Sequence, residues 1–433
     1  MTEVIKVEPN LIDKLQDFGA FDVSACFNCG TCTASCPLVK DDNLFPRGLI
    51  RLAQLGQKDR LISSKELWMC YYCGDCTANC PRGANPAEFM QSARKYAIAE
   101  FDSTGISKLF NKHKIWTLFV MTMLGILFGT MIEFSNIQQW FANDYELLGG
   151  NYGEIIHVMG VVSMIALAII VFLSVRKMII VVRKTTPIRY RSETHAKIPL
   201  IAKSKLLVES LSSLVVHQVV KQENFKAENP IKGIDLIEGN YPEYVKQMMP
   251  DSGLRISRWL IHMSIVWGFA GLLFATLYDY IVKDLILGKP GEWVPIYHPV
   301  RLIAIISGLA MMFGVSASIY YRTTKPEGEP YYQNTYFDDW LLLILIWFIG
   351  LTGFLLTILV YLPVLPTWSS LILIIHVVLV GELFFMLPFT KFAHIMYRPL
   401  ALWMLEYEER KISFVNTIGT AGETIVSHRG QAS

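Results

Sequence analysis

Long apolar stretches with few charges are concentrated after Ile115, whereas polar and apolar positions alternate at short intervals before it. Six of these stretches contain enough consecutive apolar residues to form a helix that crosses a lipid bilayer. The six predicted spans are Ile115–Phe134, Ile155–Val175, Trp259–Tyr278, Leu302–Tyr321, Trp340–Tyr361 and Leu371–Met396. The pattern therefore predicts a membrane protein with a polar N-terminal head.

Basic residues in the loops predict the orientation of these spans. The loop Ser135–Gly153 contains no Lys or Arg, whereas Arg176–Lys205 contains nine. Cytoplasmic loops carry the excess of basic residues, so the second loop is predicted to be cytoplasmic. An even number of spans then places both termini in the cytoplasm, and the N-terminal residues lack the pattern of a cleavable signal peptide. We therefore expect a multi-pass protein of the cytoplasmic membrane.

Two cysteine runs in the polar head share one spacing. Both CFNCGTCTASCP (Cys26–Pro37) and CYYCGDCTANCP (Cys70–Pro81) read C-x₂-C-x₂-C-x₃-C-P. This is the spacing of proteins that hold two [4Fe–4S] clusters, in which the fourth cysteine of each run binds the other cluster. The predicted ligands are Cys26, Cys29, Cys32 and Cys80 for the first cluster, and Cys70, Cys73, Cys76 and Cys36 for the second.

The two runs use all eight cysteines of the chain. No thiol is left for a structural disulfide, which favours a reducing compartment for the head. A pair of zinc knuckles or a disulfide framework is the alternative, and each must explain why a four-cysteine pattern ending in proline occurs twice. Gly30 and Gly74 lie between the second and third cysteines, where glycine allows a tight turn.

Five histidines lie in or beside the predicted spans: His157, His262, His298, His376 and His394. A neutral imidazole in a bilayer needs a partner, and haem iron is the partner that a membrane electron carrier requires. Interhelical hydrogen bonding is the alternative role. The remaining histidines lie in polar segments and give no functional prediction.

The last predicted span carries two of these histidines. His376 and His394 are 18 residues apart, which on one helix is five turns and about 27 Å. Pro388 lies between them and is expected to kink that helix. The spacing predicts two b haems, one near each membrane face.

Depth in the membrane predicts how the histidines pair. His262 and His394 fall near the cytoplasmic face and are assigned to an inner haem. The mate of His376 at the outer haem is either His157, which we prefer on depth, or His298, which precedes Pro299 and is equally suited to a capping or loop role.

Four ionisable residues near the spans are candidates for quinone or haem propionate contacts. Glu382 is expected either to exchange protons with a quinone or to pair with an arginine such as Arg301. Lys391 is expected to pair with a propionate or to extend to the inner surface. Arg258 and Arg301 begin two spans and are propionate candidates or ordinary basic flanks.

Other classes of function find little support. The net charge is only +2, with no basic stripe interleaved with aromatic residues, so a nucleic-acid partner is not expected. The loops typical of nucleotide and flavin sites are missing, as are the G-x-S-x-G and H-E-x-x-H motifs. The chain therefore contains no complete substrate-converting site, and we expect an electron-transfer subunit of a quinone-linked oxidoreductase complex.

The head also resembles a known family. The cysteine runs, PRGLIRLAQLG (Pro46–Gly56) and the flanks of LWMCYYCGDCTANCPRG (Leu67–Gly83) are similar to the C subunit of heterodisulfide reductase. The last four spans resemble, more loosely, the b-type cytochrome subunits of respiratory nitrate reductase and of membrane-bound heterodisulfide reductase. That nitrate reductase cytochrome takes two haem ligands from one span, whereas this chain has Leu272 in place of the second.

Such a fusion is the layout of the C subunit of the quinone-interacting membrane-bound oxidoreductase complex. The resemblance implies an α-helical ferredoxin domain with two [4Fe–4S] clusters and two b haems, menaquinone as substrate, and flavin- and iron–sulfur-containing A and B subunits as partners. It further implies electron exchange with adenylylsulfate reductase, as in dissimilatory sulfate reduction.

The expected fold is mainly α, with an α-helical ferredoxin-like domain fused to a six-span bundle. The predicted segments are a cytoplasmic iron–sulfur domain (1–110), spans one and two (111–182), a cytoplasmic connection (183–254), cytochrome b-like spans three to six (255–398) and a cytoplasmic tail (399–433). The alternatives are a membrane-bound heterodisulfide reductase-type subunit and a haem-free membrane anchor for an iron–sulfur docking domain.

Overall fold

The computed structural model confirms that the chain is mainly helical. It describes residues 6–20, 22–39, 44–112, 114–142, 152–184, 204–205, 207–210, 212, 256, 258–288, 295–326, 332, 335–361, 366–404 and 407. None of these residues lies in a β-strand.

The described residues belong to two compact units, which we treat separately. The cluster unit comprises Met1–Lys108, Phe172–Tyr241 and Phe392–Ser433. The span unit comprises Leu109–Val171 and Pro242–Lys391. The segment boundaries expected from the sequence remain predictions.

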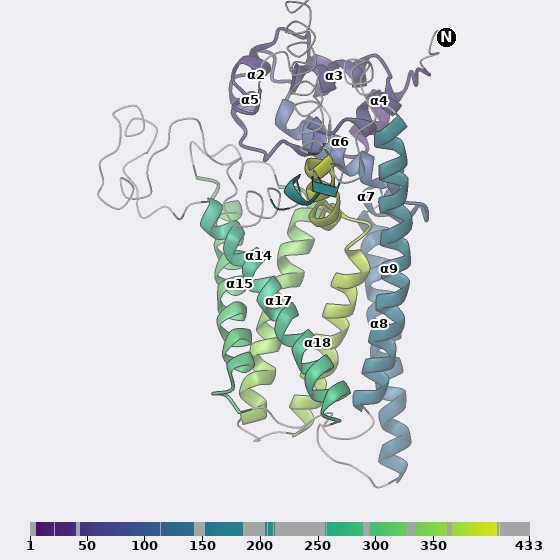
Figure 1. Cartoon of the computed structure of the whole chain (residues 1–433), viewed down its shortest axis with the longest axis vertical. Helices are drawn as coiled ribbons and strands as arrows, with labels where there is room; N and C mark the ends of the chain where they lie inside the picture. Colours follow the sequence, from purple (N-terminus) through teal and green to yellow (C-terminus); the bar gives the residue numbers. More distant parts are fainter. Residues whose placement is uncertain are drawn as a thin grey trace, which may run out of the picture. The chain divides into compact units, whose positions relative to one another are not determined.

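Short helices joined by tight turns build the N-terminal part of the cluster unit (Figure 1). They are α1 (Leu11–Gln16), η1 (Val23–Ala25), α2 (Thr31–Ala34), α3 (Arg47–Gln54), α4 (Lys58–Ser63), η2 (Glu66–Trp68), α5 (Asp75–Ala78), α6 (Pro86–Phe101) and α7 (Ile106–Lys112), the last ending in the span unit. The longest of them, α6, begins with proline at its first position, where the missing N–H has no helical partner to lose.

Helix α6 lies at the centre of the core of the cluster unit. Nearly all of its side chains are buried, and α1, α3, α4 and α5 all pack against it. Leu15, Ile50 and Phe89 are among the fully buried side chains of this core. Each such side chain stabilises the fold by about 1.5–3 kcal/mol, so the core holds the cysteine-bearing loops on a rigid support.

Two later parts of the chain complete this core. The C-terminal part of α9 (Tyr152–Lys184) contributes Met178 and Val182, and residues 392–404 contribute Tyr397 among others. The Tyr397 ring lies 5.7 Å from that of Trp68 and 5.5 Å from that of Phe101. The cluster unit is therefore assembled from segments far apart in the sequence.

Long apolar helices form the span unit. They are α8 (Lys114–Ala142), the first part of α9, α14 (Arg258–Tyr278), α15 (Pro299–Thr324), α17 (Phe337–Tyr361) and α18 (Pro366–Met386), with a π-helical segment, η5 (Asp279–Ile286), after α14. Helix α14 packs on α15, α15 on α17, α17 on α18, and α18 on α8 (Figure 1). Long apolar helices are thus confirmed where five of the predicted spans were placed.

Among the described residues, five helices are long and apolar enough to cross a membrane: Lys114–Met131, Gly160–Val182, Arg258–Val282, Pro299–Thr324 and Phe337–Leu359. The sixth predicted span, Leu371–Met396, is not one continuous helix. It is broken into Leu371–Met386 and Lys391–Met404, so the described residues contain five candidate spans, or six if this broken pair counts as one.

The break follows from Pro388. Proline has no N–H to donate and its ring clashes with the carbonyl four residues earlier, so the helix ends. The Met386 carbonyl then accepts hydrogen bonds from the Phe389 and Thr390 N–H groups, which closes a tight turn. A short 3₁₀ segment, η6 (Lys391–Ala393), follows. The expected kink is therefore a full interruption.

Glycines let α14 and α15 approach closely. A Cβ at Gly268 would lie 2.6 Å from both the Met311 nitrogen and the Ser307 carbonyl oxygen, and one at Gly314 would lie 2.7 Å from the Ile261 carbonyl oxygen. Only small residues allow this separation of two helix backbones, which is the usual way in which membrane helices associate.

Candidate functional site

The two cysteine runs have nearly the same backbone. Gly30 and Gly74 precede the short helices α2 and α5 with φ of 94° and 93°, a left-handed conformation that glycine adopts without strain. The residue before the second cysteine, Asn28 in one run and Tyr72 in the other, is also left-handed, with φ of 61° and 60°. Helices α2 and α5 lie side by side. The repeated spacing therefore produces a repeated structure.

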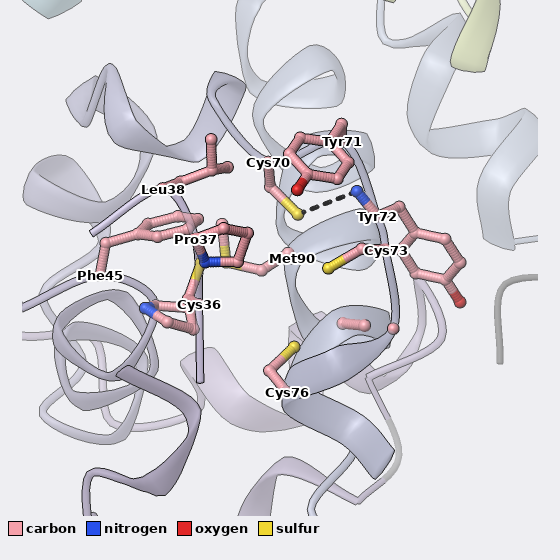
Figure 2. Close-up of a pocket in the computed structure, with 13 residues that line it drawn as sticks. Cys36, Pro37, Leu38, Phe45, Cys70, Tyr71, Tyr72, Cys73, Cys76 and Met90 are labelled. Carbon is pink, nitrogen blue, oxygen red and sulfur yellow. Dashed lines mark hydrogen bonds between the residues drawn. The ribbon is translucent and has the colours of Figure 1, made fainter. Parts of the chain in front are cut away.

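One pocket in the cluster unit is lined by Cys36, Cys70, Cys73 and Cys76. Figure 2 shows Cys36 on one side of this pocket and the three cysteines of the second run on the other. The remaining lining residues are mostly apolar and include Leu38, Phe45, Pro46, Tyr71, Ala87 and Met90. The fold thus brings the last cysteine of the first run to the first three of the second, as the predicted ligand set of the second cluster requires.

The other four cysteines lie near one another on the first run's side. Cys26, Cys29 and Cys80 are all close enough to Cys32 to act on its thiol electrostatically. Cys29 is exposed, whereas Cys32 is buried. Cys80, from the second run, therefore joins three cysteines of the first.

Backbone N–H groups donate to cysteine sulfur atoms of both proposed ligand sets. The Tyr72 N–H donates to Cys70 Sγ at 3.3 Å, drawn as the dashed line in Figure 2, and the Ala84 N–H donates to Cys80 Sγ at 3.3 Å. Such bonds stabilise thiolates and are one of the factors that set the potential of iron–sulfur clusters. Backbone hydrogen bonds also reach Cys29, Cys36 and Cys73, so both proposed ligand sets receive them.

Burial raises the pKa of thiols in both sets, including Cys32 of the first. It raises the pKa of Cys73 to about 12, and it also raises the pKa of Cys76 and Cys36. By contrast, the neighbouring Thr31 side chain lowers the pKa of the exposed Cys29 thiol. Burial thus favours the neutral thiol form of Cys36, Cys73 and Cys76, and binding iron must release their protons.

Four thiols around an apolar pocket fit an iron–sulfur cluster. Thiolate is the usual ligand of iron in these clusters, and the pocket holds four thiols that come from both runs. No three His, Cys, Asp or Glu side chains in the described ranges are gathered closely enough to hold a single metal ion. The thiols are instead distributed around the pocket.

Arginine side chains support the loop of the second run, and the cysteine spacing gave no sign of them. Arg94 Nε donates to the Leu67 carbonyl at 2.7 Å, and its Nη2 donates to the Cys70 carbonyl. Arg398 Nε donates to the Trp68 carbonyl at 3.1 Å. The only hint in the sequence was that Arg94 lies on the helix that directly follows the second run, and is therefore close to it.

A neutral side chain supports the first run. Gln54 Nε2 donates to the Cys26 carbonyl at 2.7 Å, and Gln54 Oε1 accepts from Asn28 Nδ2 at 2.6 Å. The Arg47 guanidinium lies against Gly30, where a Cβ would be 2.9 Å from Nη1. The sequence did not predict these contacts either.

His376 is a half-buried residue of α18 that contacts α17. Its Nδ1 lies 2.8 Å from Thr352 Oγ1, and a Cβ at Gly353 would be 3.2 Å from its Cε1. A histidine whose Nδ1 is held by a hydrogen bond keeps a fixed ring orientation and offers Nε2 to a ligand, the arrangement usual for metal-bound imidazoles.

The other candidate histidines are spread over both units. His262 lies in α14 and His394 directly follows η6, beyond the break after α18. The five-turn spacing of His376 and His394 on one helix is therefore wrong. His157 lies in α9, but its side chain falls outside the described residues.

His298 occupies the N-cap position of α15, as the sequence suggested. Its side chain makes no capping hydrogen bond, and its ring centroid is 6.3 Å from that of Tyr278. Its Nδ1 is buried and lacks a hydrogen-bond partner among the described residues. The N-cap position is thus confirmed, without side-chain capping.

The ionisable candidates have varied surroundings. Lys391 forms an ion pair with Asp339, a buried residue near the start of α17 that the sequence prediction missed. Glu382 is half-buried beside α8, where a Cβ at Gly125 would lie 3.0 Å from its Oε1. Within the described ranges, Glu382 makes no bond to Arg301. Arg258 and Arg301 lie in the first turns of α14 and α15.

Comparisons with known proteins identify the head of the cluster unit. Residues 22–84 match the family described as the 4Fe–4S dicluster domain. The iron–sulfur C subunit of CoB–CoM heterodisulfide reductase from Methanopyrus kandleri is 44% identical over 75 residues, which are 17% of this chain and 39% of that protein. The C subunit of the H₂:CoB–CoM heterodisulfide, ferredoxin reductase of Methanothermobacter thermautotrophicus is 38% identical over 63 residues, 14% of this chain and 34% of that protein.

The match is limited to the head. The chain spans less than two fifths of the length of these curated relatives, and no solved structure matches it. The matched region contains both cysteine runs and most of the pocket between them. The chain therefore carries an iron–sulfur dicluster domain homologous to the C subunit of heterodisulfide reductase, joined to several apolar helices long enough to cross a membrane.

Proposed function

We propose that this chain is the membrane electron-transfer subunit of a quinone-linked oxidoreductase complex. In this proposal, electrons pass between menaquinone and cytoplasmic flavin- and iron–sulfur-containing A and B subunits through two b haems and two [4Fe–4S] clusters. The further partner is adenylylsulfate reductase, as in dissimilatory sulfate reduction. Both termini lie in the cytoplasm, and the chain itself converts no substrate.

The pocket that joins the two cysteine runs is the main support. Each proposed ligand set takes cysteines from both runs, and α2 and α5, which begin within them, pack side by side. Short separations between redox centres favour electron transfer, so this arrangement suits a relay. When bound, iron–sulfur clusters and haem supply one-electron redox chemistry.

The proposed haem ligands come from the five histidines of the apolar helices. His376 fits best, because Thr352 holds its Nδ1 and leaves its Nε2 for iron. His262 and His394 form the inner pair, and His157 or His298 is the mate of His376. His298 has gained support as an alternative because its buried Nδ1 lacks a partner among the described residues.

Protons accompany electrons when a quinone is reduced or oxidised. Glu382 lies half-buried in α18 without a hydrogen bond to any described residue, and we propose that its carboxyl gives up or takes a quinone proton. Lys391 forms an ion pair with Asp339, so a propionate would have to compete with this carboxylate; Arg258 and Arg301 remain the other propionate candidates.

Optical spectroscopy of the purified full chain tests this proposal. A reduced-minus-oxidised spectrum with pyridine haemochrome quantitation should give two b haems per chain. His376→Ala and His394→Ala should each lose one haem, whereas Thr352→Ala should keep it with a shifted potential, because Thr352 only orients the ring. Iron–sulfur signals with no haem in the wild-type chain would reject the haem relay and leave the cluster assignment intact.

A haem-free membrane anchor is the second candidate. The contact of His376 with Thr352 and Gly353 joins α18 to α17 and is sufficient as an interhelical hydrogen bond. This function predicts that His376→Asn, which keeps a polar group near Thr352, preserves the stability of the protein. The relay predicts that the same variant loses a haem.

A further inference from the structure

Two arginines converge behind the second cysteine run. Arg94 reaches from α6 to the carbonyls of Leu67 and Cys70, and Arg398 reaches from the helix after η6 to the carbonyl of Trp68. All five residues belong to the cluster unit. Their guanidinium groups are close enough to act electrostatically on each other and on Cys70.

These two positive charges have no acidic partner among the described residues. Both guanidinium groups donate to backbone carbonyls, and neither pairs with a described carboxylate. Two like charges placed together repel each other, and arginine cannot relieve the repulsion by losing its proton. The arrangement is therefore favourable only if a negative charge lies nearby.

The second cluster would supply that negative charge. Its four thiolates make it an anion, and reduction adds one further negative charge. Phe45 and Met90, which line the pocket, are 2% and 1% exposed, so water has little access from that side to stabilise the added electron. Burial alone therefore disfavours reduction of this cluster, and adjacent cations favour it.

We infer that Arg94 and Arg398 raise the reduction potential of the cluster bound by Cys36, Cys70, Cys73 and Cys76. This inference rests on the proposed two-cluster function. The cations offset the effect of burial on the reduction potential, so that electron transfer between the two clusters has no large unfavourable free energy. Because both side chains donate to carbonyls of the loop, and Cys70 belongs to it, they are positioning residues as well as charges.

A redox titration followed by electron paramagnetic resonance tests this inference on the purified full chain with its clusters. Cys73→Ala identifies the signal of the second cluster by its loss. In Arg94→Gln and Arg398→Gln, that signal should titrate at lower potential, with the reduction equilibrium shifted about tenfold, which is about 59 mV for one electron. The signal of the first cluster should stay in place.

Matched variants separate charge from backbone support. Arg94→Lys and Arg398→Lys keep the positive charge but lose the planar fork, so they should retain most of the wild-type potential. Arg51→Gln removes an exposed charge of α3 that solvent screens, and it should shift neither signal. If Arg94→Gln fails to hold the second cluster, Arg398→Gln decides, because among the described residues Arg398 bonds the loop only at the Trp68 carbonyl.

Three results would overturn the inference: an unshifted second signal in Arg398→Gln, equal shifts of both clusters, or the same shift in the lysine and glutamine variants. A wild-type chain without two cluster signals would instead refute the proposed function, so the two failures are distinguishable.

Discussion

The two cysteine runs share a backbone but not an environment. In the first run Cys29 is exposed and its neighbour Phe27 is 59% exposed, whereas the pocket of the second run encloses Cys73 and Cys76. A neutral glutamine supports the carbonyl of Cys26, and an arginine supports that of Cys70. Spacing therefore sets the local fold of each run, and the surrounding core sets the chemistry available to it.

This difference suggests a direction for the relay. A redox partner that docks on the head meets the exposed Cys29 and Phe27 of the first run more easily than the pocket of the second. We therefore expect the first cluster to exchange electrons with the proposed soluble subunits. Substitutions in and around the two runs can test whether the different surroundings give the two clusters different stabilities. We take these substitutions in decreasing order of expected effect.

Loss of a pocket cysteine should remove one cluster completely. Cys73→Ala should abolish the second cluster signal and about half of the iron, because in the proposed assignment each cluster has its own four thiolates. Cys29→Ala should remove the other signal. Iron analysis and electron paramagnetic resonance of the two variants measure this.

The matched pair also tests the ligand exchange between the runs. Cys36→Ala should lose the same signal as Cys73→Ala, although Cys36 belongs to the first run. Loss of the first cluster instead would mean that each run binds its cluster alone.

Truncating Tyr397 should destabilise the core behind the second run. Its ring is fully buried against those of Trp68 and Phe101, and replacing a large buried aromatic residue by alanine costs about 3–5 kcal/mol. The second cluster should therefore be lost at a clearly lower guanidinium concentration. Absorbance of the clusters during denaturation follows this loss.

Tyr397→Phe is the control, since it keeps the ring and its packing. If Tyr397→Ala left the denaturation midpoint of the wild-type protein unchanged, residues 392–404 would not contribute to the core of the cluster unit.

The sequence was sufficient for the parts of the molecule that local rules determine. Proline-terminated cysteine spacing predicted the repeated turn, and Gly30 and Gly74 adopt the left-handed conformation that such a turn needs. Apolar stretches predicted the long helices, because a segment of that composition must bury its backbone in its own hydrogen bonds. These features depend on residues that are close in sequence.

Features that depend on distant residues were not predicted. Arg398 contacts Trp68 from the far end of the sequence, and Lys391 pairs with Asp339 of another helix. The helix break was only partly predicted, since Pro388 signals a kink, but the turn closed by the Met386 carbonyl depends on the residues after it. These features depend on tertiary contacts, which the spacing of residues in the sequence does not reveal.

Substituting the turn glycines should cost the two runs similar amounts. Gly30→Ala and Gly74→Ala force a Cβ into a left-handed conformation at φ of 94° and 93°, which costs about 1–2 kcal/mol. We expect each variant to lose its own cluster at a moderately lower temperature. Bleaching of the cluster absorbance on heating measures the effect.

Gly105→Ala is the matched control for backbone strain. Gly105 also has a positive φ, of 81°, and an added Cβ there meets nothing within 4 Å. It should lower the unfolding temperature without lowering the iron content of the folded protein. An equal loss of iron in all three variants would contradict a specific role for the turns.

The smallest expected effect concerns the support of the first run. Gln54→Ala removes the hydrogen bond to the Cys26 carbonyl and the one from Asn28, at a net cost of about 1 kcal/mol. Because Cys29 of the first run is exposed, the freed loop should open to water, and a chelator should take iron from the first cluster several times faster than in the wild-type protein. Gln57→Ala is the control, since it removes the side-chain hydrogen bond from Arg60, outside the cysteine runs.

Faster loss from the second cluster in Gln54→Ala would contradict the difference between the runs. In that case the glutamine would act through the shared core rather than through the Cys26 carbonyl. Loss confined to the first cluster would instead mean that each run depends on its own supporting side chain, a neutral amide at the exposed cluster and a pair of cations at the buried one. The electron path would then run between two sites of similar backbone whose stabilities and potentials are adjusted separately.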